Sequence, residues 1–411
     1  MSTQHNSHSV SASTIALCLA VALLEGFDLQ AAGIAGPRMA HEFGLTVAQL
    51  GEFFSAGAIG LLPGAAIGGR LADRIGRKRV LMVSVLLFGL FSLATTQASN
   101  FHSLLIVRLL TGLGLGAAMP NLISLCMEAA GPNRRGTAVG VMYCGMPFGA
   151  VIGALVGIMA SAPTQWRAVF YVGGFSPLVV VLLMAFLLRE SAQFEAVQLP
   201  TGDRPGFVDA LWREGRAVTT AALWIAYLGT LIVLYFLMNW LPSMTIANGL
   251  THEQGGLLLI ACNVGAGLGA VGIASLMDRI GRGRTVLLMY AGMLVGLTLL
   301  SRTRGIELML VSAFLCGIFI AGGQSVLYAL AGQAYPTKVR GTGVGAAVAI
   351  GRLGAIIGPL VAGVLLSIGF SASTLVFYSL PLIAVSALGA MLVVMHFRTA
   401  RESVGRPVTQ S

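Results

Sequence analysis

The chain has 411 residues, of which 56% are hydrophobic and only 10% charged, so too little polar surface exists to cover a soluble globule of this size. Its formal net charge of +10 would suit a nucleic-acid-binding protein, but the basic residues lie in short connections between long apolar runs. Composition and charge placement therefore exclude a soluble globule and a nucleic-acid partner, and they predict a protein surrounded by lipid.

Twelve apolar runs follow one another along the chain. Most are ~18–25 residues long, which at about 1.5 Å per residue is enough to cross ~30 Å of hydrocarbon as a helix. They predict an all-α membrane protein with twelve transmembrane helices. The predicted spans are 14–36, 48–70, 80–99, 103–128, 137–160, 168–188, 217–240, 253–276, 285–301, 307–330, 341–366 and 373–396.

The connections between these runs fix the expected orientation. With the N-terminus in the cytoplasm, 19 of the 25 Lys and Arg residues are cytoplasmic, two lie inside the membrane, and four face outward: Arg38, Arg167, Arg302 and Arg304. The positive-inside rule therefore places both termini in the cytoplasm. The first run lacks the basic start of a cleaved signal peptide and carries two acids, so we expect it to be retained as a span.

Two acids lie inside the first predicted span. Glu25 and Asp28 are one helical turn apart and share a face of the helix. Charged carboxylates cost a few kcal/mol each in hydrocarbon, which favours a role in loading and releasing protons. Arg108 in the fourth span lies at a comparable depth, and we expect Asp28 or Glu25 to pair with it when ionised and to release it when protonated. The alternative is a permanent ion pair, or an acid that caps helix amides.

A loop motif recurs half a chain later. Asp73-Arg74-Ile75-Gly76-Arg77 returns as Asp278-Arg279-Ile280-Gly281-Arg282, and Arg135-Gly136-Thr137 returns as Arg340-Gly341-Thr342 at the same separation. The sequence therefore predicts two pseudo-symmetric six-helix bundles of ~200 residues each, with the site between them. A tight cytoplasmic turn, in which glycine permits a positive φ, is expected after span two from Gly69, Asp73, Arg74, Gly76, Arg77 and Lys78.

The two copies of this loop are expected to act as gates. By the internal symmetry, Asp73 would reach the start of span eleven near Arg340, while Asp278 would reach the start of span five near Arg135; Arg279 is the neighbour of Asp278 in the second loop and belongs to the same gating set. Such contacts would hold the cytoplasmic side shut until the halves rock apart. The alternative is a topology signal within a stable turn.

One long connection separates the two copies. It contains prolines, glycines and both signs of charge, which is typical of a linker. The predicted organisation is a cytoplasmic tail (1–13), an N-terminal six-helix bundle (14–188), a cytoplasmic linker (189–216), a C-terminal six-helix bundle (217–396) and a cytoplasmic tail (397–411). The five cysteines lie in apolar runs without metal-ligand spacing, so we expect packing residues rather than disulfides or a zinc site.

A second intramembrane arginine, Arg352, lies near the middle of the eleventh span. No acid is near it in sequence, and its planar fork of donors suits a carboxylate, so we expect it to bind an anionic substrate. It could instead pair with Glu25, or do both in alternate states. Other polar side chains at membrane depth could line a pocket for a hydroxylated aromatic ring, although helix packing explains each of them equally well: Tyr143, Tyr227, Asn263, Gln324 and Tyr328.

These motifs resemble the major facilitator superfamily across essentially the whole chain. Three segments resemble the signatures of its aromatic acid:proton symporter branch: Glu25-Gly26-Phe27-Asp28, the segment 108–116 and Gly351-Arg352-Leu353-Gly354-Ala355. Within that branch, four stretches resemble the bacterial transporters of 3-(3-hydroxyphenyl)propionate: LEGFDLQAAGIA from Leu24, MPNLISL from Met119, RGTAVGVMYCG from Arg135 and GGQSVLYALAG from Gly322.

The resemblance implies proton-coupled uptake of an aromatic carboxylate across the bacterial inner membrane. It assigns proton and substrate coupling to Glu25 and Asp28 and gating to Asp73 and Asp278. Several hydroxybenzoate members carry an aspartate where this chain has Glu25, and the second loop has Gly283 in place of a basic residue.

The sequence thus predicts a secondary active transporter that imports 3-(3-hydroxyphenyl)propionate, or a related phenylpropanoid or hydroxybenzoate, by proton symport through alternating access. The proton gradient supplies the energy and no cofactor is expected. The expected partners are the substrate, protons and the lipid bilayer, with no obligatory protein partner. The alternatives are a proton-coupled exporter of drugs or metabolites and a membrane receptor without transport. No enzyme activity is expected, because the six histidines are scattered at tails and edges.

Overall fold

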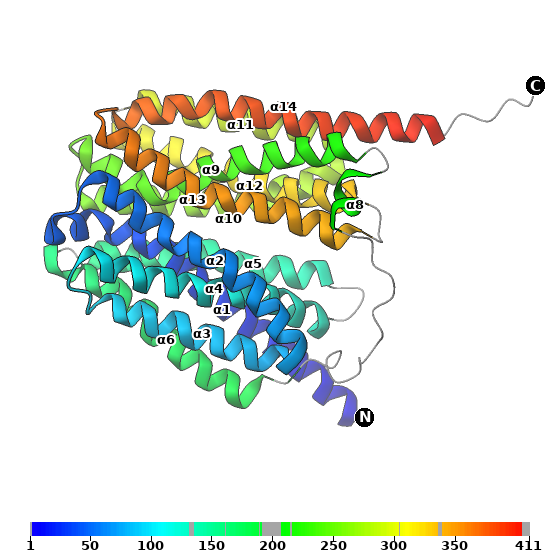
Figure 1. Ribbon diagram of the computed structural model, residues 1–411, viewed down its shortest axis with the longest axis horizontal. Coiled ribbons are helices and arrows are strands. Elements are labelled where there is room, and N and C mark those ends of the chain that lie inside the picture. The colour runs from blue at the N-terminus through cyan, green and yellow to red at the C-terminus, as the bar shows by residue number, and fades with distance from the viewer. Residues whose placement is uncertain are drawn as a thin grey trace, which may run out of the picture. The chain divides into compact units, whose positions relative to one another are not determined.

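The computed structural model describes residues 2–130, 135–160, 162–188, 190, 207–213, 216–303, 305–335 and 339–404, and these residues form helices and turns without a strand. The first part of the chain holds α1 (Ser2–Phe43), α2 (Val47–Ile75), α3 (Arg77–Thr95), α4 (Phe101–Ala129), α5 (Arg135–Met159), the 3-10 helix η1 (Pro163–Trp166) and α6 (Arg167–Leu187). The rest holds α8 (Phe207–Trp212), α9 (Ala217–Ala247), α10 (His252–Ile280), α11 (Arg282–Arg302), α12 (Ile306–Ala334), α13 (Arg340–Ser367) and α14 (Ala372–Val404) (Figure 1).

Twelve helices in the described residues are long and apolar enough to cross a membrane, so the predicted all-α, twelve-span fold is confirmed. Their surfaces carry large apolar side chains that water would not favour. Phe186 is 86% exposed, Met159 82% and Leu182 62%. Exposed apolar area of this kind is stable when lipid covers it.

The first span is longer than the sequence predicts. We expected it to end at residue 36, but α1 continues through Pro37 to Phe43. Arg38, which we expected on the outer side of the membrane, is buried in the first unit. The Arg38 guanidinium donates to the carbonyls of Ala160 and, at 3.2 Å, of Gly157. These carbonyls lie at the C-terminal end of α5, where the helix has no amides left to satisfy them.

The starts of the helices and the turns between them follow from local sequence. Thr46 and Gln49 form a capping box at the start of α2, in which Gln49 N donates to Thr46 Oγ1 (3.2 Å) and Thr46 N to Gln49 Oε1 (2.9 Å). Gly76, between α2 and α3, has φ of 99°, and Gly281, between α10 and α11, has φ of 83°. Both copies of the repeated loop therefore turn where glycine adopts a positive φ, as the sequence predicts.

Contacts between residues divide the chain into two compact units. The first comprises Met1–Leu199, Phe236–Val264 and Pro359–Ser371; the second comprises Pro200–Tyr235, Gly265–Gly358 and Ala372–Ser411. Helices α9, α10 and α13 thus contribute to both units. The division of the chain at the linker stays a prediction, and within the predicted linker the short helix α8 spans Phe207–Trp212.

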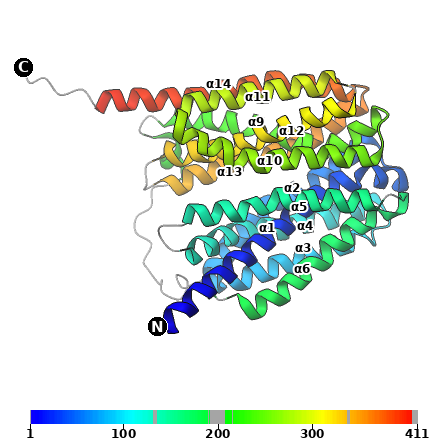
Figure 2. The same ribbon diagram turned by 180° about the vertical axis from the view of Figure 1, so that it is seen from behind.

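In the first unit, α1 packs against α5, α2 against α4, and α3 against α4 and α6. In the second unit, α11 packs against α12 and α14. The pairs α3 with α6 and α11 with α14 lie side by side in both views (Figures 1 and 2).

Glycines allow α2 and α4 to approach closely. A Cβ built on Gly57 of α2 would lie 3.1 Å from Nε of Arg108, and a Cβ built on Gly112 of α4 would overlap the carbonyl group of Gly57. The side chain of Arg108 therefore lies across a part of α2 that carries no side chain.

Candidate functional site

The two acids of the first span are both fully buried. Glu25 and Asp28 have no exposed surface in α1. Gly26 between them packs against α5, where an added Cβ would lie 2.5 Å from Cα of Met146. Close contact between α1 and α5 thus fixes the position of the backbone that carries the Glu25 and Asp28 side chains.

Asp28 forms an ion pair with Arg108 of α4. Arg108 Nη1 donates to Asp28 Oδ2 at 2.7 Å and Nη2 donates to the backbone carbonyl of Asp28 at 3.0 Å. The side chains are 4% and 0% exposed, so the pair is removed from solvent. Burial of a charge costs several kcal/mol, which the opposite charge and the additional hydrogen bond offset. The structure thus pairs the intramembrane arginine of span four with Asp28.

Neither partner has used all of its hydrogen-bonding capacity. Asp28 Oδ1 and Arg108 Nε have no hydrogen-bond partner among the described residues. A carboxylate has two oxygens, and the second one can accept a proton while the first stays in contact with the guanidinium. The arrangement is chemically able to switch between an ion pair and a neutral acid beside an arginine.

In the second unit, Arg352 of α13 lies beside α9. It is half-buried, and its Nη1 donates to the hydroxyl of Tyr235 at 3.4 Å. Gly351, the preceding residue, packs against Tyr227 and Leu231 of α9, where a Cβ would lie 3.0 Å from Cδ1 of Tyr227. The guanidinium is thus held next to a row of α9 side chains.

Two of the predicted pocket tyrosines contact each other. The rings of Tyr227 and Tyr328 lie edge to face, 5.8 Å apart with an interplanar angle of 81°. Aromatic rings favour this geometry, which sets the positive edge of one ring against the negative face of the other. Because Tyr227 also contacts Gly351, the structure brings Arg352, Tyr227 and Tyr328 into one region of the second unit.

Tyr235 completes this region and could not be singled out from its own position in the sequence. It lies eight residues after Tyr227 on α9, with Leu231 halfway between, so all three follow one side of the helix. That spacing is the signal that could have found it.

The remaining predicted pocket residues are divided between the two units. Tyr143 of α5 is half-buried and belongs to the first unit, as does Asn263 of α10, which is buried. Asn263 Nδ2 donates to the carbonyl of Leu259 in its own helix at 2.9 Å, a contact that satisfies its amide within α10. Gln324 of α12 is half-buried in the second unit.

The first repeated loop is tied to its own bundle. Arg77 forms an ion pair with Glu128 at the end of α4, and Glu190 Oε1 accepts a hydrogen bond from Lys78 N at 3.0 Å. Lys78 Nζ donates to the carbonyl of Ala185 near the end of α6 at 3.1 Å. Neither acid was predicted, although Glu128 is a lone acid at the end of an apolar run. These contacts fasten α3, α4 and α6 together.

The predicted gating contacts of the two loops cannot be followed in the structure, because their side chains lie outside the described ones. These are the side chains of Asp73, Arg135, Asp278 and Arg340. Gly69 lies within α2, while Arg74 and Arg279 are exposed in the last turns of α2 and α10. The gating role of this set stays a prediction.

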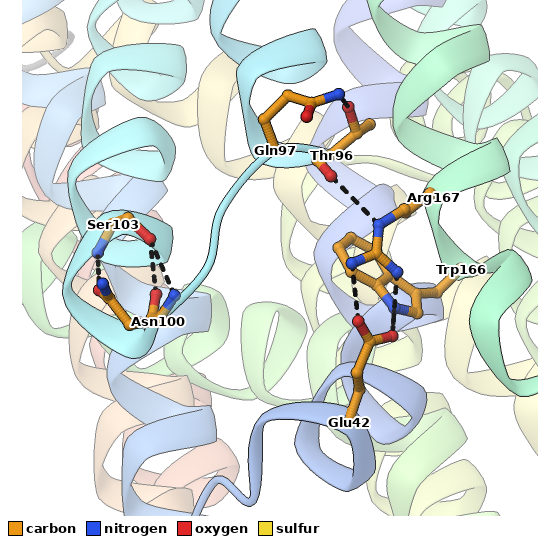
Figure 3. A network of polar contacts seen from close by, with 7 residues as sticks. All are labelled: Glu42, Thr96, Gln97, Asn100, Ser103, Trp166 and Arg167. Atoms are coloured by element: carbon orange, nitrogen blue, oxygen red, sulfur yellow. Dashed lines mark hydrogen bonds and ion pairs between the residues drawn. The ribbon is translucent and has the colours of Figure 1, made fainter.

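A polar cluster joins α1, α3 and α6 at the opposite end of the bundle (Figure 3). Glu42 accepts hydrogen bonds from Trp166 Nε1 (2.5 Å) and from both terminal nitrogens of Arg167 (3.0 and 2.6 Å). Arg167 Nε donates to the carbonyl of Thr96, and its guanidinium lies 4.3 Å from the centre of the Trp166 ring. The cluster holds the ends of three helices in fixed relative positions.

Comparisons with known proteins agree with this architecture. The profile described as Major Facilitator Superfamily matches residues 18–250 and 223–410. A "3-(3-hydroxy-phenyl)propionate transporter" of Escherichia coli (strain K12) is 48% identical over 94% of both chains. A "Gallate transporter" of Pseudomonas putida is 34% identical over 93% of this chain and 92% of the relative.

A "4-hydroxybenzoate transporter PcaK" of Pseudomonas aeruginosa is 33% identical over 87% of this chain and 86% of its own. Among solved structures, a D-xylose-proton symporter aligns with a TM-score of 0.78 over 93% of this chain and 96% of that chain, at 18% identity, which supports the fold alone. The twelve helices, the duplicated loop and these matches together establish that the chain belongs to the Major Facilitator Superfamily of membrane transporters.

Proposed function

We propose that this protein imports an aromatic carboxylate together with protons across the bacterial inner membrane, with both termini in the cytoplasm. The observation that carries the proposal is the buried ion pair between Asp28 and Arg108, one helical turn from the buried Glu25. A stable fold gains little from such an ion pair in lipid, whereas a proton carrier needs an acid whose charge can be formed and removed there.

Protonation of Asp28 would change the contact with Arg108 directly. The neutral acid loses the charge that offsets the arginine, so the attraction between α1 and α4 weakens while the guanidinium still bonds to the backbone carbonyl of Asp28 at 3.0 Å. The proton would thus alter how firmly α1 is held to α4. Such a local charge change can bias a two-state rearrangement of the bundles.

The substrate class follows from the second unit. Arg352 can donate its N–H groups to a carboxylate. Tyr227, which is buried, and Tyr328 pack edge to face in the same region, and such an aromatic environment suits an aromatic group. The relatives whose names specify 3-(3-hydroxyphenyl)propionate, gallate and 4-hydroxybenzoate transport support the same class. The 48% identity to the first of them favours 3-(3-hydroxyphenyl)propionate or a related phenylpropanoid.

The transport cycle would neutralise each of these costly charges in turn. Outward-open protein takes a proton on Asp28 or Glu25 and a carboxylate on Arg352, the bundles rock about the site, and both ligands leave on the inside. One anion with one proton moves no net charge, whereas a second proton would add ~2.3 kcal/mol per 100 mV of membrane potential. The proton gradient is therefore a sufficient energy source.

Uptake into proteoliposomes tests this proposal. Radiolabelled 3-(3-hydroxyphenyl)propionate, cinnamate, benzoate and 4-hydroxybenzoate are compared with and without an imposed proton gradient, for the native chain and for Arg352→Ala. Arg302→Ala is the matched control, because Arg302 is an exposed arginine of the same unit. We expect gradient-driven accumulation that Arg352→Ala abolishes and Arg302→Ala leaves intact. Accumulation that needs no gradient, or flux only in the export direction, would contradict the proposal.

A further inference from the structure

A backbone carbonyl in α9 lacks its usual helical donor. Pro242 lies inside α9, and since proline has no N–H, the carbonyl four residues earlier, that of Met238, receives no hydrogen bond from position 242. A buried carbonyl without a donor is destabilising, so another group is needed to satisfy it.

Gln30 of α1 supplies that donor. Its Nε2 lies 2.5 Å from the carbonyl oxygen of Met238, and its side chain is 3% exposed. Gly33, one turn further along α1, allows the close approach, because a Cβ there would lie 2.9 Å from the same oxygen and 3.0 Å from that of Asn239. All these residues belong to the first unit.

Neighbouring contacts in the same unit bring α2, α9 and α13 together. Trp240 Nε1 donates to the carbonyl of Pro359 at 3.0 Å, and the Trp240 ring lies edge-on to Phe54 of α2 at 5.2 Å. Gly51 of α2 contacts Gly363 of α13, because a Cβ built on Gly51 would lie only 3.0 Å from Cα of Gly363. The helices of the N-terminal bundle are thus in contact with the segments of α9 and α13 that lie after Tyr235 and Gly358.

In the predicted topology this contact region lies toward the outer side of the membrane, because α1 runs outward from a cytoplasmic N-terminus and Gln30 lies beyond its midpoint. In a transporter that works by alternating access, the region must separate each time the outer side opens. The Met238 carbonyl would then be hydrated by water in the open pathway, at little cost.

We propose that Gln30 is the latch of the outer gate: its amide satisfies the carbonyl that Pro242 leaves open when the outer side is shut, and water satisfies it when the outer side opens. The inference rests on the proposed alternating-access function. An uncharged amide suits this role, since a single hydrogen bond holds the closed state. When that hydrogen bond breaks, no charge is left that would need hydration or a new ionic partner.

Cysteine labelling from outside tests the latch without any substrate. Ala154 of α5 has no exposed surface and lines a cavity with Pro242 of α9 and Gly256 of α10, a cavity that none of the five native cysteines lines. In an Ala154→Cys background, a membrane-impermeant methanethiosulfonate reagent is added to intact cells. The labelling rate of the native chain without this substitution is subtracted.

Gln30→Met keeps the length of the side chain and removes the donor, so we expect labelling about tenfold faster, which corresponds to ~1.4 kcal/mol of lost closed-state stability. Gln30→Asn, one methylene shorter, should accelerate labelling similarly. The matched control is Asn121→Leu, because Asn121 is an equally buried amide that donates to Ala117 of its own helix. We expect this control to label at the parental rate.

Pro242→Ala gives the decisive comparison. Alanine at this position restores an N–H to which the Met238 carbonyl can bond within α9, so adding Gln30→Met to Pro242→Ala should change the labelling rate less than twofold. Equal acceleration in both backgrounds, or no acceleration by Gln30→Met and Gln30→Asn, would overturn the latch. Because labelling needs no substrate, it reports on the gate even where the uptake assay contradicts aromatic-acid transport.

Discussion

Removing the charge of Asp28 is the sharpest test of whether that charge stabilises the buried Arg108 in the first unit. In Asp28→Asn, the amide oxygen can still accept from Arg108 Nη1 and the backbone carbonyl can still accept from Nη2, so both hydrogen bonds of 2.7 and 3.0 Å have acceptors. What disappears is the negative charge beside a side chain that is only 4% exposed.

Loss of one partner of a buried ion pair costs ~3–5 kcal/mol, mainly because the other charge is left uncompensated. Because Asp28→Asn retains both acceptors, we expect it to lose ~3 kcal/mol of stability. Asp28→Ala should lose an amount toward the upper end of that range. The double variant Asp28→Asn with Arg108→Gln removes both charges and should recover ~2 kcal/mol or more of that loss.

Thermal unfolding in detergent, followed at one heating rate because such unfolding is irreversible, measures the order of these variants. We expect the native chain and the double variant to unfold at similar temperatures, Asp28→Asn lower, and Asp28→Ala lowest. If Asp28→Asn unfolds with the native chain, or if the double variant is less stable than the single one, the charge of Asp28 does not hold Arg108 and the reasoning is wrong.

Three further predictions test the packing and the polar contacts. Gly60→Ala should destabilise the protein by ~2 kcal/mol more than Gly57→Ala. The new methyl group would overlap the α4 backbone at position 60, at the Leu109 carbonyl oxygen, but at position 57 it would lie 3.1 Å from the side chain of Arg108; melting temperatures decide the order. Glu42→Gln should lower stability by ~1 kcal/mol, since it weakens a bidentate, partly exposed ion pair, and should leave uptake unchanged at saturating substrate. Tyr235→Phe removes the hydroxyl 3.4 Å from the α13 guanidinium and should raise the substrate concentration for half-maximal uptake several-fold without lowering stability.

The number and nature of the spans could be predicted from the sequence because length and hydropathy are local properties. The end of α1 could not. Proline at position 37 favours a stop, yet α1 continues to Phe43, where tertiary contacts sustain it: Arg38 binds the end of α5 and Glu42 binds Trp166 and Arg167. Such contacts join positions more than 100 residues apart and leave no periodic pattern in the sequence.

The charged part of the site was accessible to the same local reasoning, because acids and arginines in lipid are rare and costly. Depth along two predicted helices was enough to suggest Asp28 or Glu25 as a partner of Arg108, and the structure contains the pair with Asp28. Tyr235 was missed although its spacing from Tyr227 places both on one side of α9. Gln30 could not be predicted, because its role depends on a contact with another helix, the Met238 carbonyl that Pro242 leaves without a donor.

The central claim is that an acid buried in α1 carries the proton that drives uptake. Asp28 is the acid paired with Arg108, and Asp28→Asn in proteoliposomes tests its role most directly. Asparagine stays neutral, like the protonated acid, so exchange of labelled for unlabelled substrate across the membrane should persist while accumulation driven by a proton gradient is lost. Accumulation by Asp28→Asn at the native level, with protons still entering alongside the substrate, would contradict the account.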